Sequence, residues 1–310
     1  MRFLVTGGAG FIGSHIIERL LTNGNEVICL DNFDHYYDPV LKRANIEKFI
    51  GERRFRLIEG DINDRALLSH VLKGVEYIFH EAAQPGVQAS VENPSKPHSI
   101  NATGTLTLLE MALKSDVKKI INASSSSVYG KVAYLPFDEE HPKEPLSPYG
   151  ISKLSAEGYC RVFHELYGLQ SVSLRYFTVY GPRMRPDLAI NIFVRLALKN
   201  EPITIYGTGN KTRDFTYIDD IVNANMISVK KGKGAYNIGG GHRISIQELA
   251  EKIIEITKSS SSIQHKESNK GDAEHTYAQI TKARREIGWE PKVSLEQGLK
   301  RYVEWVSTYQ

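Results

Sequence analysis

The sequence predicts an α/β fold in which a doubly wound parallel sheet is followed by a smaller α/β lobe. In the first half of the chain, short apolar runs typical of buried strands alternate with amphipathic helical patterns. A glycine-rich turn joins the first of these strands to the first helix. From Gly181 the alternation loosens and prolines interrupt it. We therefore expect a large lobe over residues 1–178, with a returning segment near 214–240, and a smaller lobe over residues 179–310.

The composition is that of an ordinary soluble globular protein. The 310 residues are 41% hydrophobic and 24% charged, which is ample for a buried core. A net charge of +3 is too small to argue for nucleic acid or a membrane surface as a partner. Cys29 and Cys160 provide neither a disulfide framework nor the spacing of a metal site, and no apolar run approaches bilayer length. We expect a cytoplasmic protein without a bound metal.

The N-terminal elements carry the first motif. Residues 2–6 form a β-rich run that opens into Gly7-x-x-Gly10-x-x-Gly13, a helical pattern follows, and the next apolar strand ends at Asp31. This order of elements is the context of a Rossmann-type dinucleotide site. Bare glycine backbone lets a pyrophosphate approach the amide groups at a helix N-terminus. The charge of Asp31 would repel a 2′-phosphate and no arginine follows it, so the pattern favours NAD over NADP.

The alternation continues along the chain. Asp61 follows the strand that begins at Phe55, where it would bond an adenine amino group or cap the helix beginning near Asp64. Small Ala82 and Ala83 follow a strand over residues 75–80 and would let a cofactor lie close to the strand end. We expect further strands over residues 118–123, 171–176 and 203–206, and helices over residues 101–113, 149–167, 190–198 and 245–257.

A tyrosine and a lysine four residues apart begin the helix over residues 149–167. Ser147 suits the cap and Pro148 the first helical position, so Tyr149 and Lys153 should share one face in the first turns. A neighbouring ammonium lowers the pKa of a phenol toward the range where general acid–base catalysis is efficient. Taken alone, the pair is also common on ordinary helix surfaces. The serine run 124–127 lies upstream of it.

Four motifs together resemble the extended short-chain dehydrogenase/reductase family, and more narrowly its NAD-dependent nucleotide-sugar 4-epimerases. They are the glycine turn, Tyr149-x-x-x-Lys153, the segment SSSSVYG over residues 124–130, and Arg213-Asp214-Phe215. The resemblance implies that Tyr149 removes the proton of the sugar 4-hydroxyl while a hydride passes to NAD⁺ and later returns to the opposite face. It also implies that Lys153 holds the nicotinamide ribose and lowers the pKa of Tyr149, and that Ser125 bonds the same sugar hydroxyl.

The resemblance also implies two sets of binding residues. The cofactor set is Gly7, Gly10, Phe11, Ile12, Gly13, Asp31, Asn32, Asp61, Ile62, Ala82, Ala83, Gln84, Ser124, Tyr149, Lys153 and Tyr176. Gln84 is a departure, because many hexose epimerases have lysine there. The substrate set is Ser125, Ser126, Ser127, Thr178, Arg185, Tyr206, Arg213, Asp272 and Thr276. Within it, Arg213 matches an arginine on the UDP phosphates, Tyr206 an aromatic on uracil, and Asp272 an acid on the uridine ribose.

The sugar is less sharply indicated. Thr178 stands where glucose-type epimerases have asparagine, and the segment around it is similar to the UDP-glucuronate 4-epimerases. There Thr178, the serine run and Arg185 would bind the C5 carboxylate, although Arg185 would equally suit a salt bridge within its loop. A small Thr276 at the gate position leaves room for an N-acetyl group, so UDP-N-acetylglucosamine remains open beside UDP-glucose.

Two other functions remain as alternatives. Dehydratases and decarboxylases of the same family carry an acid beside the catalytic hydroxyl, whereas this chain has Ser126 and Ser127 there. Non-catalytic NAD-sensing relatives usually lose the tyrosine–lysine pair, which this chain retains. By the same resemblance we expect a homodimer formed through the helices at about residues 101–113 and 149–167.

Overall fold

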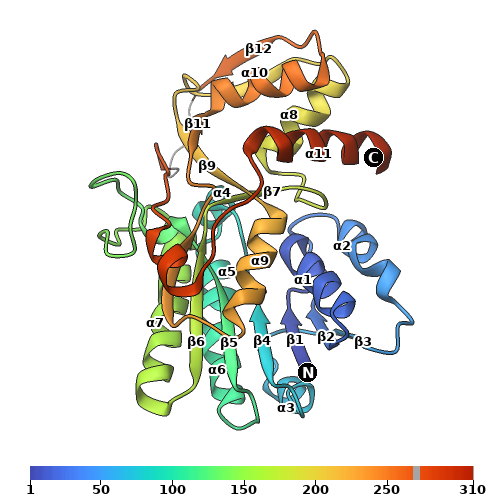
Figure 1. Ribbon diagram of the computed structural model, residues 1–310, viewed down its shortest axis with the longest axis vertical. Helices are drawn as coiled ribbons and strands as arrows, with labels where there is room; N and C mark the ends of the chain where they lie inside the picture. Colours follow the sequence, from blue (N-terminus) through green and yellow to red (C-terminus); the bar gives the residue numbers. More distant parts are fainter. Residues whose placement is uncertain (268–272, 310) are drawn as a thin grey trace.

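The structure, a computed structural model, describes residues 1–267 and 273–309. Its larger lobe is built on a seven-stranded sheet of order β10-β6-β5-β4-β1-β2-β3, in which every neighbouring pair is parallel (Figure 1). The strands are β1 Arg2–Thr6, β2 Glu26–Asp31, β3 Phe55–Glu59, β4 Tyr77–His80, β5 Lys119–Ser125, β6 Gln170–Tyr176 and β10 Gly234–Ile238. The predicted doubly wound α/β fold is confirmed.

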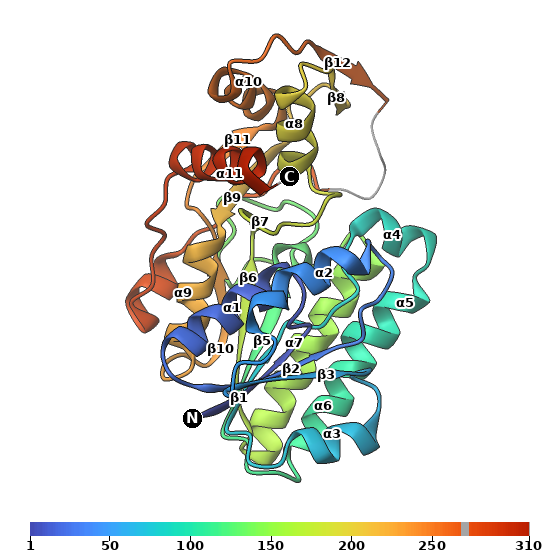
Figure 2. The same cartoon turned by 90° about the vertical axis from the view of Figure 1, so that its right-hand side faces the viewer.

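Helices cover both faces of this sheet (Figure 2). One face carries α1 (Phe11–Thr22) packed beside α9 (Ile218–Ser228), and buried Ile16, Ile17 and Ile221 fill the space between them and the sheet. The opposite face carries α3 (Arg65–Val71), α6 (Gly104–Ala112) and α7 (Pro148–Tyr167) over a second apolar cluster. Shorter helices α2 (Pro39–Ile46), α4 (Val87–Glu92) and α5 (Ser95–Pro97) lie in the connections.

The strand order reverses between β1 and β4. Chain leaving β1 runs to α1 on one face, whereas chain leaving β4 runs to the helices on the other face. The carboxyl ends of two such strands leave a crevice, which is where open α/β sheets bind ligands. The glycine turn and the segment Glu81-Ala82-Ala83 therefore meet at this point.

Local signals set most element boundaries, with two differences from the sequence-based prediction. The strand expected to end at Ala123 continues to Ser125, so the first two serines of the run belong to β5. The helix expected from Asn101 starts earlier as a π-helical segment, His98–Thr103, before α6. The predicted helix near Asp64 is confirmed, and Asp64 itself caps it by accepting from the Leu67 amide at 2.9 Å.

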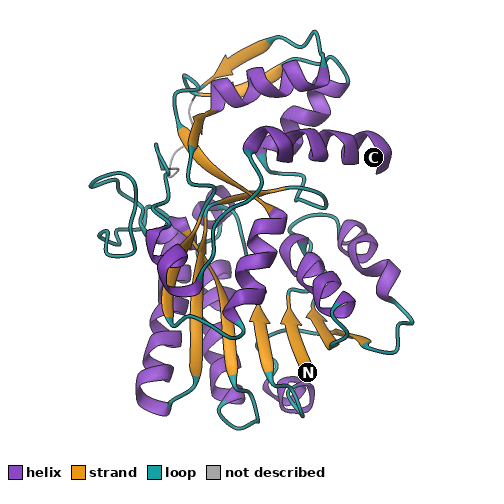
Figure 3. Cartoon of the chain, viewed as in Figure 1, coloured by secondary structure: helices purple, strands orange, loops and turns teal. Residues whose placement is uncertain are grey.

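In the smaller lobe, as far as the structure describes it, helices pack against short sheets (Figure 3). A three-stranded sheet is formed by β7 (Thr178–Tyr180), β9 (Thr212–Tyr217) and β11 (Arg243–Ser245), and a two-stranded sheet by β8 (Ile203–Tyr206) and β12 (Ile263–Lys266). The helices are α8 (Ala189–Leu198), α10 (Ile246–Thr257) and α11 (Leu295–Tyr309). Within residues 1–267 and 273–309, no helix is both long and apolar enough to cross a bilayer.

Candidate active site

Two cavities share a wall at the crevice of the large sheet. The first cavity is lined by the glycine turn, Asp31, Asp61, Ala82 and Lys153. The second cavity is lined by residues 124–127, Thr178, Arg185, Arg213 and Thr276. Side chains that line both include Tyr149, Tyr176 and Arg185. The predicted catalytic tyrosine therefore stands where the two spaces meet.

The glycine turn forms a closely packed backbone cradle in the first cavity. Gly7 adopts a φ of +64°, and a Cβ built on Gly13 would lie 2.4 Å from the Gly7 carbonyl oxygen. Side chains are thus excluded from the turn, and its backbone runs directly into the N-terminus of α1, where the Ser14 amide donates to Gly10 at 3.1 Å. Free amides at a helix start, unobstructed by side chains, suit a pyrophosphate.

Two carboxylates, those of Asp31 and Asp61, line the first cavity. Asp31 is 6% exposed, and its two oxygens accept from the Ala9 amide at 3.1 Å and the Phe33 amide at 2.8 Å. Burial raises the pKa of Asp31, while the nearby charge of Lys42 opposes that shift. Asp61 accepts from the Asn32 side-chain amide at 3.0 Å and from the Asn63 amide at 2.8 Å, so it does not cap the helix. Both carboxylates are oriented before any ligand arrives.

The start of α7 follows its sequence signals. Ser147 accepts from the Gly150 amide at 3.1 Å, Pro148 occupies the first turn, and the predicted helix start is confirmed. Burial raises the pKa of Tyr149, whereas a hydrogen bond with the Ser125 hydroxyl and the charge of Arg185 lower it. The proton of the phenol is therefore controlled from β5 and from the loop that carries Arg185.

Lys153 lines the first cavity together with Tyr149. The residue is 5% exposed, and its ammonium donates to the Ala123 carbonyl at 2.7 Å. Burial lowers the pKa of Lys153 to about 8, and the carboxylate of Glu81 raises it. Among the charged groups near Tyr149, Arg185 lowers the pKa of the phenol, and the effect of Lys153 on it stays a prediction.

The serine run divides between two roles. The Ser124 hydroxyl donates to buried Glu157, which also forms a bidentate ion pair with Arg175 at 2.8 Å. This network ties α7 to β5 and β6, so it fixes the helix that carries Tyr149. Ser125 accepts from the Ser127 amide at 3.1 Å and lies beside Tyr149, at the boundary of the second cavity.

The Arg185 fork is already occupied by a carboxylate. Asp187 accepts from Arg185 at 2.9 and 3.1 Å, and the Tyr36 hydroxyl donates to the same carboxylate at 3.0 Å. The guanidinium also lies over the Tyr36 ring, 5.5 Å from its centre. The salt bridge within the loop, which was the alternative for Arg185, is therefore formed, while Arg185 still lines both cavities.

The chain is similar to known proteins over nearly its whole length. A family model described as GDP-mannose 4,6 dehydratase matches residues 4–302, which is nearly the whole chain. This chain belongs to that family of extended short-chain dehydrogenases/reductases. UDP-glucuronate 4-epimerase of Thermodesulfobacterium geofontis, a relative within the family, is 40% identical over 98% of this chain and 95% of its own.

Two solved structures of family members are also similar over their full length. The UDP-glucuronic acid 4-epimerase of Bacillus cereus, in complex with UDP-glucuronic acid and NAD, has a TM-score of 0.95 at 37% identity, covering 100% of both chains. The UDP-glucose 4-epimerase of Thermotoga maritima, with UDP-glucose, has a TM-score of 0.93 at 39% identity, covering 99% of both chains. The resemblance inferred from the sequence motifs is confirmed.

The structure does not bring every candidate residue of the family together. Tyr206 ends β8 with 53% of its surface exposed and lies outside the lining of both cavities. Asp272 falls outside the described residues. Arg213 lines the second cavity and donates to the Thr212 carbonyl at 2.9 Å, and Thr276 accepts from the Asp214 amide at 3.2 Å.

Gln84 and Tyr176, both in the cofactor set, have fixed partners. Gln84 is 4% exposed, its amide donates to Asn101 at 2.7 Å, and its side chain donates to the Pro85 carbonyl at 3.2 Å. Asn101 also donates to Ser152 on α7, so the loop after β4 and the catalytic helix are joined. The Tyr176 hydroxyl lies 3.0 Å from Glu81.

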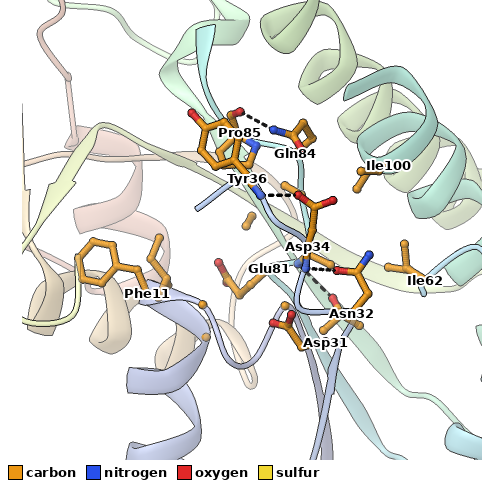
Figure 4. Close-up of a pocket in the computed structure, with 18 of the residues that line it drawn as sticks. Phe11, Asp31, Asn32, Asp34, Tyr36, Ile62, Glu81, Gln84, Pro85 and Ile100 are labelled. Carbon is orange, nitrogen blue, oxygen red and sulfur yellow. Dashed lines mark hydrogen bonds between the residues drawn. The ribbon is translucent and has the colours of Figure 1, made fainter. Parts of the chain in front are cut away.

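Sequence reasoning missed several residues that shape this site in the family fold. The loop after β2 brings Asp34, Tyr36 and Tyr37 to the first cavity, and α2 brings Lys42. Glu81 enters it from the end of β4 (Figure 4). Paired aromatics after the second strand and an acid directly after the fourth were the available signals. Asp187 was missed because its part in the site depends on the ion pair with Arg185, which the structure shows.

Proposed function

We propose that this protein is an NAD-dependent UDP-sugar 4-epimerase and that UDP-glucuronate is its sugar nucleotide. The observation that supports this most directly is the position of Tyr149 in the wall between the two cavities, beside Ser125. On one side lies a glycine cradle suited to a dinucleotide. On the other lies a space lined by hydroxyls and two arginines, as a charged sugar nucleotide requires.

In the proposed mechanism, Tyr149 takes the proton from the sugar 4-hydroxyl and later returns it. The Ser125 hydroxyl orients that hydroxyl and stabilises negative charge on the phenol oxygen, since hydrogen bonding to a charged form favours it. Bound NAD supplies hydride acceptance and donation at C4. Lys153, whose ammonium donates to the Ala123 carbonyl and which lines the same cavity, would bind the nicotinamide ribose. Because the 4-keto sugar is planar at C4, turning it over before the hydride returns inverts the centre.

The sugar assignment rests on Arg185 and Thr178. A uronate carboxylate would take the place of Asp187 in the guanidinium fork, exchanging one charge-assisted pair for another. The Thr178 hydroxyl and Ser126 and Ser127 line the same cavity and supply hydrogen-bond donors. The relatives named for UDP-glucuronate support the same choice.

A second sugar, UDP-N-acetylglucosamine, is favoured by one observation. Thr276, at the gate position, is small and lines the second cavity. A 4,6-dehydratase or a uronate decarboxylase would require an acid beside the catalytic hydroxyl, and Ser126 and Ser127 occupy those places. A non-catalytic NAD-sensing role is opposed by the retained pair of Tyr149 and Lys153.

We extend the proposal to the rest of the chain. Arg213, Tyr206 and Asp272 would bind the UDP part, so residues 179–310 would form the UDP-sugar lobe and residues 1–178 with 214–240 the NAD lobe. A homodimer through α6 and α7 is supported by exposed Leu113, Ile151 and Leu166 on or next to these helices. Free, buried Cys29 and Cys160 suit a reducing cytoplasm.

Proton NMR of the purified protein with each UDP-sugar alone tests the function. We expect a new C4-epimer signal with UDP-glucuronate. Conversion of UDP-N-acetylglucosamine or UDP-glucose instead would keep the reaction and reject the Arg185 assignment. Absence of turnover on all three, with NAD bound, would reject the epimerase and favour a sensing role.

A further inference from the structure

Glu81 is an acid that the proposed mechanism does not use. It follows directly on β4, at the strand reversal, and its side chain points into the first cavity (Figure 4). Its own amide is fixed by the Thr6 carbonyl at 3.1 Å. Lys153, Tyr149 and Tyr176 line the same cavity. A carboxyl group therefore stands among the groups that move the proton.

A chain of hydrogen bonds orients the Glu81 carboxylate. The Asn225 side-chain amide on α9 donates to the Ile221 carbonyl at 2.9 Å and to the Tyr176 hydroxyl at 2.7 Å. The Tyr176 hydroxyl has two acceptors for its proton, Glu81 Oε1 and Asn225 Oδ1, each at 3.0 Å. The carboxylate is thus held from β6 and α9, independently of Lys153. Such a chain fixes a charge at a defined place in a site of low dielectric.

We propose that Glu81 is a positioning residue that sets the charge states of Lys153 and Tyr149. Its negative charge keeps the buried Lys153 ammonium protonated, because an opposite charge favours the charged form of a neighbour. The same charge opposes ionisation of Tyr149, so it raises the proton affinity of the phenolate that accepts the proton of the sugar 4-hydroxyl.

The electrostatic surroundings support this assignment. Lys153 and Tyr149 on α7 and Tyr176 on β6 line the same cavity as Glu81, whose charge raises the pKa of each of them. The charge of Arg185 lowers the pKa of Tyr149. Burial raises the pKa of Glu81 to about 7, with the Tyr176 hydroxyl and Lys153 opposing the shift. Glu81 therefore gains its charge as pH rises through neutrality. Below that pH its influence on Lys153 and Tyr149 is lost.

The test measures the titration of Tyr149 directly, so that it does not depend on which sugar is turned over. Tyrosinate absorbance is followed against pH, and the curve of the Tyr149→Phe variant is subtracted to isolate Tyr149. We expect Glu81→Gln, which removes the charge but keeps an acceptor for Tyr176, to lower the apparent pKa of Tyr149 by about 1 pH unit. Glu81→Asp keeps the charge, so the apparent pKa of Tyr149 should remain close to that of the unaltered protein.

A matched control distinguishes this role from a structural one. Glu139 is also a buried glutamate, 8% exposed, and accepts from the Asn237 amide at 2.8 Å, but it does not line either cavity. Glu139→Gln should leave the Tyr149 titration in place, even if it lowers the unfolding temperature. An unchanged titration in Glu81→Gln, or an equal shift in both variants, would overturn the inference. The proposed function fails separately, through the NMR assay.

Discussion

The two cavities that meet at Tyr149 are built in opposite ways. The first cavity is formed largely by main chain and by side chains at the ends of adjacent strands, and the two oxygens of Asp31 are held by backbone amides. The second cavity takes its polar side chains from β5, β7, the Arg185 loop, β9 and residues 273–276, which are far apart in sequence. Its central cation, Arg185, is held by another side chain.

This difference indicates which contacts of the site a substitution can change and which it cannot. Backbone amides of a packed turn cannot be changed without breaking the fold, so the dinucleotide end is invariant in its chemistry. A side-chain pair such as Arg185–Asp187 is exchanged by a ligand or altered by one substitution. We therefore expect the reaction to depend on the shared wall, the sugar on the second cavity alone, and cofactor retention on the first.

The largest expected effect comes from the wall that both cavities share. Tyr149→Phe removes the group that transfers the proton, so turnover should fall by about 10³-fold, within the range of general acid–base catalysis. Binding of a UDP-sugar, measured by calorimetry, should change little because the ring remains. Retained turnover would remove Tyr149 from the mechanism.

Substitutions at Arg185 separate the second cavity from the first. Arg185→Ala should lower kcat/KM for UDP-glucuronate by about 10- to 100-fold, as expected for loss of a charge-assisted hydrogen bond. A neutral UDP-sugar should lose much less. Asp187→Asn is the matched variant: it frees the guanidinium and should lower KM for the uronate. Equal losses on charged and neutral sugars would contradict the carboxylate role.

Two glycines test the first cavity. A methyl group on Gly13 would meet the Gly7 carbonyl oxygen, so Gly13→Ala should destabilise the fold by about 1–3 kcal/mol and reduce bound NAD. Gly158, inside α7, has no atom within 4 Å of a built Cβ. Gly158→Ala should therefore stabilise the fold by about 0.5–1 kcal/mol, with NAD retained. Denaturant unfolding measures the stability of the two variants, and cofactor absorbance measures their bound NAD. Equal stability and equal NAD content in both would contradict close packing at Gly13.

The last expected effect is on stability alone and concerns His80, the final residue of β4. His80 bridges the Thr6 and Thr105 hydroxyls at 2.8 and 2.9 Å, and burial lowers its pKa to about 3. The unfolded chain then binds the extra proton below about pH 6.5, so stability is full above that pH and falls as pH approaches 3. This one group should cost about 2 kcal/mol between pH 7 and pH 5. In the His80→Gln variant, the unfolding free energy should therefore fall less between pH 7 and pH 5. The same fall in the variant and the unaltered protein would contradict the role of His80.

What could be predicted from the sequence follows the same division. The first cavity is encoded locally: strand, glycine turn, helix and Asp31 lie within 31 residues, and Ser147 and Pro148 announce the start of α7. A salt bridge within the Arg185 loop was also foreseen as an alternative, and its partner Asp187 lies only two positions away. Contacts between distant segments were not predictable: Tyr36 and Asp187 are separated by 151 positions, and Glu81 and Tyr176 by 95, so only the folded chain shows them as neighbours.

The place of β10 at the edge of the large sheet also bears on how the chain folds during synthesis. β6 ends at Tyr176, whereas the strand that pairs with it, β10, begins at Gly234. While the intervening residues emerge from the ribosome, β6 presents an open edge that another strand can pair with. The large sheet is completed only after much of the smaller lobe has been made. Slow translation or premature termination between these two strands would therefore favour aggregation over a folded N-terminal fragment.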